Sequence, residues 1–279
     1  NTDSIDNSAG VDCSDHEVNI KILVDSVVAQ SDLTEKQRNN LLESMTEQVG
    51  YLVLRHNYHQ NRAITMIEQH SAKLLNDVKW LIDILEKKGH LNRLLETIPD
   101  NEELKERAAK GQGLVRPEIS VLLAYSKQLL KQELIVELSD LDERLFQHEL
   151  KQYFPQQLQE QFPQEIEKHC LAHEIVANGL VNSFVNRMGM VLAFKLMEET
   201  GCSIVAVFNV YKRVCSTFAV ENLWKEIESQ DLILNANVLE ELQGYIRKII
   251  ERAMHWFLTQ EPTLSDDAIY TNGIAELKT

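Results

Sequence analysis

Long stretches of this 279-residue chain lack helix-breaking residues, and their apolar side chains recur at spacings of three and four. Only 10 Gly and 5 Pro residues interrupt the sequence, while Leu, Glu, Gln and Lys are frequent, which favours long helices. Alternating apolar and polar runs bounded by turn residues do not stand out, so strands should be scarce. The pattern predicts an all-α, multi-helix bundle.

The first expected helix carries an apolar stripe formed by Ile20, Leu23, Val24, Val27 and Val28. A break with capping residues is expected over 31–35, and the tail after Pro262 is expected to fray. The stretch 119–134 is apolar on nearly every side and should lie near the centre of the bundle. Further helices, or stretches of helix, are expected over 42–53, 57–88, 98–111, 119–134, 166–185, 190–199, 204–218, 223–227 and 238–257.

The charge of the chain narrows the range of partners. Lys and Arg number 28 against 43 Asp and Glu, a formal net charge of −15 that repels nucleic acid and anionic lipid. The four cysteines, Cys13, Cys170, Cys202 and Cys215, show no paired spacing, and no secretory leader or membrane-spanning apolar run stands out. These features predict a cytoplasmic protein. Because the chain begins with Asn inside what resembles a structural motif, we expect a fragment.

The stretch Asn7–Glu17 combines turn residues, a helix start and several polar groups. Asn-Ser-Ala-Gly suits a tight turn, and Ser14 precedes Glu17 by the spacing of a capping box. A helix N-terminus can bind anions through its free N–H groups, but Asp12, Asp15 and Glu17 would compete with such a ligand. From the residues alone, Ser14 as a plain N-cap is favoured over Ser14 as a ligand contact.

Two pairs of histidines were candidates for metal binding. His169 and His173 have the i, i+4 spacing that places two imidazoles on one helix face, but no third and fourth ligand is evident. His56 and His59 more plausibly mark a helix break or a hydrogen-bonded contact between helices. We therefore predict no metal site, and a free-standing metal-binding bundle stays open as a third alternative that elemental analysis would remove.

Two further features favour structural roles. Gly111-Gln112-Gly113 has no third glycine and no preceding strand, so phosphate binding is not predicted there. Trp80, Trp224 and Trp256 lie at helical spacing among apolar residues and are expected in the core.

The stretch from Asn1 to Lys21 resembles the corresponding part of the bacterial large-subunit NAD-specific glutamate dehydrogenases. The opening motif is long and specific, and the similarity extends over nearly the whole chain. Weaker similarity lies in 53–58, 113–118, 122–125, 185–189 and 198–201.

The resemblance implies roles for individual residues. Asn7, Ser8 and Gly10 would belong to the turn beside the nicotinamide of NAD, and Ser14 would hold the side-chain carboxylate of the substrate. Ser8 and Ala9 depart from the usual Ala-Gly, and Asp15 and His16 stand where related enzymes have aromatic residues. The catalytic lysine and aspartate of the family and its glycine fingerprint have no counterpart here, so no catalytic residue is assigned and this piece alone is expected to be inactive.

The resemblance also implies an organisation of the chain. Residues 1–30 would be the C-terminal edge of an α/β dinucleotide-binding catalytic domain, and 31–279 a C-terminal helical domain. The intact enzyme would use NAD to convert L-glutamate to 2-oxoglutarate and ammonium in glutamate catabolism. Its expected partners are the upstream catalytic domain and further copies in a homo-oligomer. The alternative is a helical regulatory or oligomerisation module that never touches substrate.

Overall fold

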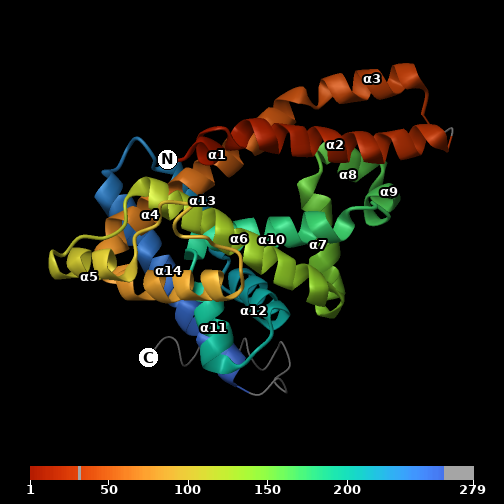
Figure 1. Cartoon of the computed structure of the whole chain (residues 1–279). Helices are drawn as coiled ribbons and strands as arrows, with labels where there is room; N and C mark the ends of the chain where they lie inside the picture. The colour runs from red at the N-terminus through yellow and green to blue at the C-terminus, as the bar shows by residue number, and fades with distance from the viewer. Residues whose placement is uncertain (31–32, 261–279) are drawn as a thin grey trace. The chain divides into compact units, whose positions relative to one another are not determined.

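A computed structural model describes residues 1–30 and 33–260, and every regular element in this part of the chain is helical. Contacts divide the chain into two compact units, residues 1–191 and 192–279. Figure 1 labels the elements along the chain. The helices of the first unit are α1 (Asp3–Asp6), α2 (Ser8–Ala29), α3 (Glu35–Ser44), α4 (Thr46–Lys87), α5 (Asn101–Ala109), α6 (Arg116–Glu137), α7 (Glu143–Tyr153), α8 (Gln156–Gln161), α9 (Pro163–Glu167) and α10 (Ala172–Met188), with a 3₁₀ turn over Leu138–Asp140.

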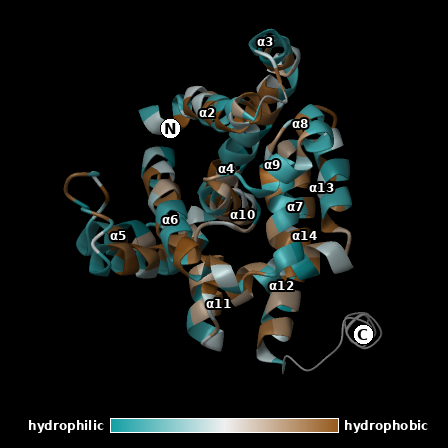
Figure 2. Cartoon of the chain, turned by 90° about the vertical axis from the view of Figure 1, so that its right-hand side faces the viewer, coloured by the Kyte–Doolittle hydropathy of each residue, from teal (hydrophilic) through white to brown (hydrophobic). Residues whose placement is uncertain are grey.

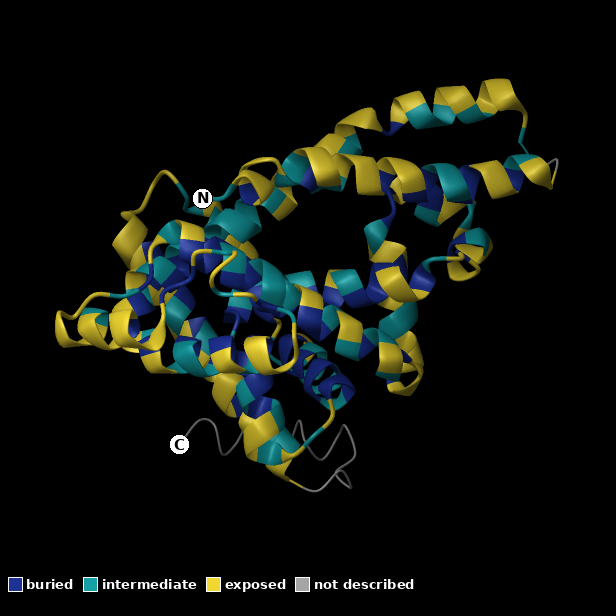
Figure 3. Cartoon of the chain, in the orientation of Figure 1, coloured by how far each residue is buried: buried dark blue, intermediate teal, exposed yellow. Residues whose placement is uncertain are grey.

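The predicted all-α fold is confirmed for the described residues, and α6 lies at the centre of the first unit. It packs on both α4 and α10, and it buries apolar residues along its length. Figure 3 shows buried residues concentrated where these helices meet. The sequence predicted this position, because 119–134 offers apolar side chains in every direction.

The start of α6 follows from local chemistry. Pro117 occupies the first turn, where its missing N–H has no helical partner to lose. The Glu118 carboxylate accepts the N–H of Val115 at 2.8 Å and both terminal nitrogens of Arg107 at 2.8 and 2.9 Å. Gly113 lies so close to α4 that a Cβ there would stand 2.1 Å from the Ser71 hydroxyl oxygen. Gly113 therefore allows the loop before α6 to pack closely on α4.

The helix α4 runs without interruption for 42 residues, about 63 Å. The prediction of a possible break at His56 and His59 is wrong, because no proline interrupts this stretch and its one glycine, Gly50, is compatible with a helix. Next to it, α2 and α3 lie side by side, and α3 has no buried residue (Figure 1). The Thr34 side chain caps α3, whereas the predicted break residues Ser31 and Asp32 lie outside the described residues.

A second prediction, a continuous helix over 166–185, is also wrong. The chain forms α9 and α10 with a break at 168–171. Within the break, the His169 Nδ1 accepts the N–H of Leu171 at 3.1 Å. This bond takes a donor that a continuous helix would give to a carbonyl one turn earlier.

The second unit consists of α11 (Leu192–Thr200), α12 (Ile204–Thr217), α13 (Val220–Ser229) and α14 (Ala236–Thr259), described up to residue 260. All four were predicted, but α13 begins at Val220, in a region that the sequence analysis left outside a helix. Trp224 is 1% exposed, as predicted for a core residue, while Trp80 and Trp256 are only partly buried. The predicted fraying after Pro262 concerns residues outside the described part.

Hydrophilic and hydrophobic residues lie on the same helices in both units, as Figure 2 shows for the described residues. Among the described helices, none combines the length and the apolar character that crossing a membrane requires. The predicted domain boundary at residue 30 separates the edge of a catalytic domain from the helical domain. The division into two units at residue 191 does not test this boundary, which stays a prediction.

Candidate functional site

The stretch Asn7–Glu17 forms helix from Ser8 onward rather than a turn followed by a helix at Ser14. The prediction of Ser14 as an N-cap is therefore wrong. The Asn7 carbonyl accepts the N–H groups of Gly10 and Val11 at 3.1 and 3.4 Å, which begins the helix two turns earlier. Inside it, the Ser14 hydroxyl donates to the Gly10 carbonyl at 3.2 Å.

Three of the four residues predicted to bind ligands lie on one exposed side of α2. Asn7, Gly10 and Ser14 are exposed, and Val11 and Val18 on the same side are 65% and 53% exposed. The exposed, yellow face of α2 is visible in Figure 3. This segment is therefore not sealed within the helical core, so polypeptide or ligand could dock against it.

Ser8, the fourth predicted residue, points elsewhere. It is partly buried, and its hydroxyl accepts a hydrogen bond from the Asn57 Nδ2 at 2.8 Å. A Cβ at Gly10 would lie 2.8 Å from the Oδ1 of Asn7, an exposed side chain that could turn away, so packing does not require glycine there. The ligand roles of Asn7, Ser8, Gly10 and Ser14 stay predictions.

The opposite face of α2 carries a polar cluster in the interior. His16 is 1% exposed and its ring stacks on Tyr153, with the ring centroids 4.5 Å apart. The His56 ring is also roughly parallel to the His16 ring, at a centroid distance of 5.8 Å. The His16 Nε2 lies 3.8 Å from the Asp12 Oδ1, which is too long for a hydrogen bond. Neither nitrogen of His16 has a hydrogen-bond partner among the described residues.

The neighbours of His16, by contrast, are well connected. The Tyr153 hydroxyl donates to the Asp15 Oδ2 at 2.9 Å and accepts from the Asn19 Nδ2 at 2.8 Å. Burial raises the pKa of the Tyr153 hydroxyl, so that it stays protonated. The Asn19 carbonyl accepts a hydrogen bond from the His169 Nε2 at 3.1 Å, and burial lowers the pKa of His169. His169 is thus neutral, with its proton on Nε2.

Burial also lowers the pKa of His16, while the nearby Asp12 carboxylate opposes that shift. The His56 Nδ1 lies 2.9 Å from the Asp12 Oδ2, so Asp12 stands between two imidazoles. A neutral imidazole offers a lone pair to a proton or a metal ion. His16 was not among the sequence candidates. The available signal was the i, i+4 spacing of Asp12 and His16, but the partners from α4 and α7 are distant in sequence.

The other histidine pair differs from its prediction. His169 precedes α10 in the break described above, so it does not share a helix face with His173. The His173 ring packs edge-on against Phe146 at 5.4 Å. The predicted placement of both imidazoles on one helix face is therefore wrong. In contrast, the contact between helices predicted for His56 and His59 is confirmed, because His56 bonds Asp12 of α2 and His59 accepts from Arg187 of α10.

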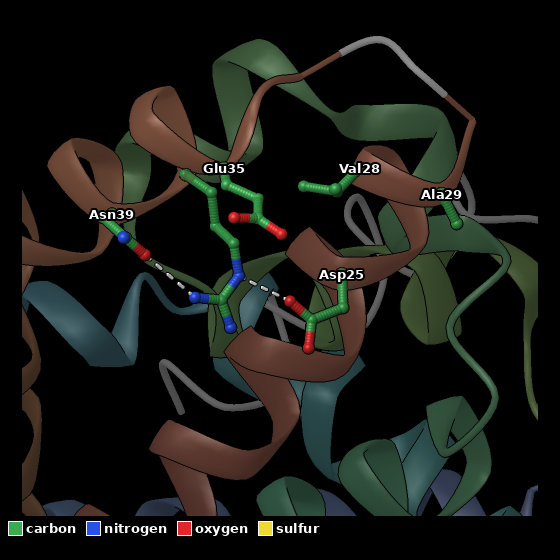
Figure 4. A pocket seen from close by; sticks show the side chains of 6 residues that line it. Asp25, Val28, Ala29, Glu35 and Asn39 are labelled. Atoms are coloured by element: carbon green, nitrogen blue, oxygen red, sulfur yellow. Dashed lines mark hydrogen bonds and ion pairs between the residues drawn. The ribbon is translucent and has the colours of Figure 1, made fainter.

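A hollow of about 500 Å³ lies between α2 and α3, at the end of α2 remote from Ser14. Figure 4 shows Asp25, Glu35 and Asn39 among the residues that line it. The Arg38 Nε forms an ion pair with the Asp25 Oδ1 at 2.5 Å. A second bond joins the Arg38 Nη1 to the Asn39 Oδ1 at 3.0 Å. Because Arg38, the one cation among the described residues that line this hollow, is already paired with Asp25, the hollow offers little to an anionic ligand.

Comparison with known proteins gives two family matches. Residues 111–278 match the family described as "Glutamate dehydrogenase, C-terminal". Residues 1–67 match "Bacterial NAD-glutamate dehydrogenase, catalytic domain", a match that includes α2, α3 and the first half of α4. The exposed face of α2 and the Asp12–His16–His56 cluster both fall within the second match.

Three curated relatives are similar over almost the whole chain. Each is named NAD-specific glutamate dehydrogenase. The protein from Pseudomonas aeruginosa is 42% identical over 92% of this chain, that from Halomonas elongata 40% over 95%, and that from Mycobacterium tuberculosis 39% over 94%. The aligned region is 16% of the length of each relative.

Proposed function

We propose that this chain, which belongs to the glutamate dehydrogenase family, is part of an NAD-dependent enzyme that oxidises L-glutamate to 2-oxoglutarate and ammonium. The chain spans 16% of the length of its curated relatives, so the activity belongs to the larger protein. This proposal includes a role in glutamate catabolism in the cytoplasm.

One observation carries the assignment of a site within this chain. The residues of the family-like opening motif lie on an exposed helix face that contains Asn7, Gly10 and Ser14 beside the exposed Val11 and Val18. Exposed valines next to small polar residues suit a face that another surface or ligand covers. In our proposal, residues 1–30 form the edge of the catalytic domain, and this face lines its crevice.

The proposed roles follow the chemistry of each residue. Ser14 would donate its hydroxyl to the glutamate side-chain carboxylate, exchanging its bond to the Gly10 carbonyl for a charged acceptor. Asn7 and Gly10 would adjoin the nicotinamide of NAD, where a glycine allows close approach. Ser8 would contribute its backbone only, because its hydroxyl is engaged by Asn57.

The chain by itself should not catalyse the reaction. Hydride transfer needs a lysine, an aspartate and a dinucleotide-binding loop held around the substrate, and the family counterparts of these groups are expected upstream. Adding the purified chain to NAD and glutamate should give no NADH above a blank. Measurable turnover would refute this part of the proposal.

Kinetics of the intact enzyme test the site. Ser14→Ala should raise KM for glutamate by about 10- to 100-fold. This range corresponds to the loss of a hydrogen bond to a charged group, which contributes about 1.5–3 kcal/mol. Asn7→Ala should raise KM for NAD. Ser229→Ala is the matched control, since Ser229 is also exposed and donates to a carbonyl of its own helix, that of Glu226, at 2.7 Å, besides accepting from the neighbouring Gln230 Nε2 at 3.1 Å. Unchanged kinetics in the Ser14 and Asn7 variants would reject the site assignment.

A second candidate function, an oligomerisation module, is favoured by the surface of α14. Val238, Leu242, Tyr245 and Ile249 are 38–53% exposed and follow one another at spacings of four, three and four. This is the seam that a like helix can cover in a coiled coil, so the proposed occupant is a second copy of the chain. Leu242→Glu should lower the oligomeric mass in sedimentation, whereas an unchanged mass would reject this role.

A further inference from the structure

We infer that Asp12, His16 and His56 form a binding site for a divalent transition metal ion, with Zn²⁺ as the best fit. Within the described part of the chain, they are the one group of three potential ligands whose donor atoms all lie within 4.8 Å of one another. Asp12 and His16 are one turn apart on α2, and His56 comes from α4. The inference does not depend on the proposed enzymatic function.

The state of His16 is the strongest evidence. An imidazole has one donor and one acceptor nitrogen when neutral, and buried polar atoms are nearly always hydrogen-bonded. Nevertheless, His16 is 1% exposed and neither of its nitrogens has a hydrogen-bond partner among the described residues. Its Nε2 lies nearest to the carboxylate of Asp12. A metal ion between His16, Asp12 and His56 would give that nitrogen a partner.

The distances allow coordination after a small adjustment. Zinc–ligand bonds of about 2.0–2.2 Å place tetrahedral ligand atoms about 3.3 Å apart. Here the Asp12 oxygens lie 3.8 Å from the His16 Nε2 and 2.9 Å from the His56 Nδ1. The His56 side chain is 45% exposed and can rotate, whereas the stack on Tyr153 fixes the His16 ring. One side of the site is therefore held in place and the other can close on the ion.

The surrounding groups act as an outer shell. Asp15 is bonded to the Tyr153 hydroxyl, so this second carboxylate of α2 supports the tyrosine rather than the ion. The Tyr153 ring in turn stacks on the His16 ring and holds its orientation. Such partners commonly set the orientation of metal-binding imidazoles.

The donor set limits the choice of ion. Two imidazoles and one carboxylate suit Zn²⁺ and other first-row divalent ions, and they do not suit Ca²⁺ or Mg²⁺, which prefer oxygen ligands. Three protein ligands leave a fourth position, which opens toward the partly exposed Asp12 and His56 side chains. A water molecule or a small ligand could occupy it.

Metal uptake by the whole, untagged chain tests the inference. After treatment with a chelator and its removal, Zn²⁺ is titrated calorimetrically, and Co²⁺ is added to a second sample for its visible spectrum. We expect about one high-affinity ion per chain and the intense Co²⁺ bands of a tetrahedral site with nitrogen and oxygen ligands. No uptake beyond weak, non-stoichiometric binding would overturn the inference.

Variants identify the ligands. His16→Phe keeps an aromatic ring against Tyr153, and His56→Gln changes a side chain that is 45% exposed. Circular dichroism checks the fold of each variant. Each should weaken binding by about a hundredfold or more and abolish the Co²⁺ bands. His255→Gln is the control, because His255 is an exposed histidine 4.0 Å from a carboxylate, that of Glu199, and should bind as the parent does. If the His16 and His56 variants bind like the control, the site does not exist.

Discussion

The helices α2 and α6 have the same length, 22 residues, but treat their buried polar groups differently. In α6, the buried hydroxyls of Ser120 and Ser126 donate to carbonyls of their own helix, each at 2.8 Å. In α2, the buried His16 has no hydrogen-bond partner among the described residues. The buried hydroxyls of α6 are satisfied within the helix, whereas α2 keeps a buried imidazole that folding alone does not explain.

The largest difference in stability between variants of α6 and α2 should appear when an apolar side chain is shortened to alanine. Leu130 of α6 is 0% exposed, and Leu130→Ala should lower the free energy of unfolding by about 3–4 kcal/mol, because it leaves a cavity. Val18→Ala on the exposed face of α2 should change it by less than about 0.5 kcal/mol. Urea denaturation measures both. Equal losses would mean that the α2 face is packed, contrary to our account.

The next largest effect on stability is expected from the ion pair between Glu118 and Arg107 at the start of α6. Glu118 accepts three hydrogen bonds, from both terminal nitrogens of Arg107 and from the Val115 N–H. Glu118→Ala should reduce the free energy of unfolding by about 2–4 kcal/mol, since it removes three hydrogen bonds and leaves the partly buried guanidinium of Arg107 with only the more exposed carboxylate of Glu103. Glu106→Ala, which removes an exposed 3.5 Å pair with Lys110, should have almost no effect. Similar values for the two variants would contradict this interpretation.

A buried cation makes α6 sensitive to pH. The Lys127 ammonium donates to the Gln60 Oε1 at 3.0 Å, and burial lowers its pKa to about 7. The unfolded chain, with a lysine pKa of about 10.5, binds this proton more tightly. This group therefore makes stability rise with pH between about 7 and 10.5, and its full penalty is present below pH 7.

Lys127→Met removes that penalty. The variant should be more stable than the parent by about 1–3 kcal/mol at pH 6, and the difference should shrink as the pH rises toward 10. Thermal unfolding across this pH range measures it. A variant that is less stable at pH 6 would show that the ammonium makes a favourable interaction that outweighs its burial.

The smallest effect concerns the two buried histidines near α2, measured with a chelator present. His16→Phe should change the free energy of unfolding by no more than about 1 kcal/mol, because it retains the ring and removes two nitrogens that have no partner among the described residues. His169→Phe should cost about 1–3 kcal/mol, since it leaves the Asn19 carbonyl and the Leu171 N–H without their partner. A larger loss of unfolding free energy for His16→Phe than for His169→Phe would show that the His16 nitrogens have hydrogen-bond partners in the folded chain.

The sequence predicted most helices because their signals are local. Asp100 caps α5 by accepting the N–H groups of Glu102 and Glu103, and Pro117 marks the start of α6. Predictions failed where two local signals competed. The spacing of Ser14 and Glu17 indicated a capping box, but the Asn7 carbonyl already starts the helix at Ser8. At His169, a side-chain bond to the Leu171 N–H ends a helix that periodicity would continue.

The candidate site divides in the same way. The motif containing Asn7, Gly10 and Ser14 could be found from adjacent residues, although its exposure could not. The surroundings of His16 could not be predicted, because His56 and Tyr153 come from helices far along the chain. Periodicity assigns a residue to a face, but it does not identify which side chains meet that face.

The most direct test of the central claim is a structure of the complete enzyme with NAD and 2-oxoglutarate bound. Our account predicts that the exposed face of α2 lines the crevice, with the Ser14 hydroxyl within about 2.6–3.2 Å of the ligand carboxylate and Asn7 and Gly10 beside the nicotinamide. A structure in which this face is covered by another helix, or remains in solvent away from both ligands, would contradict it.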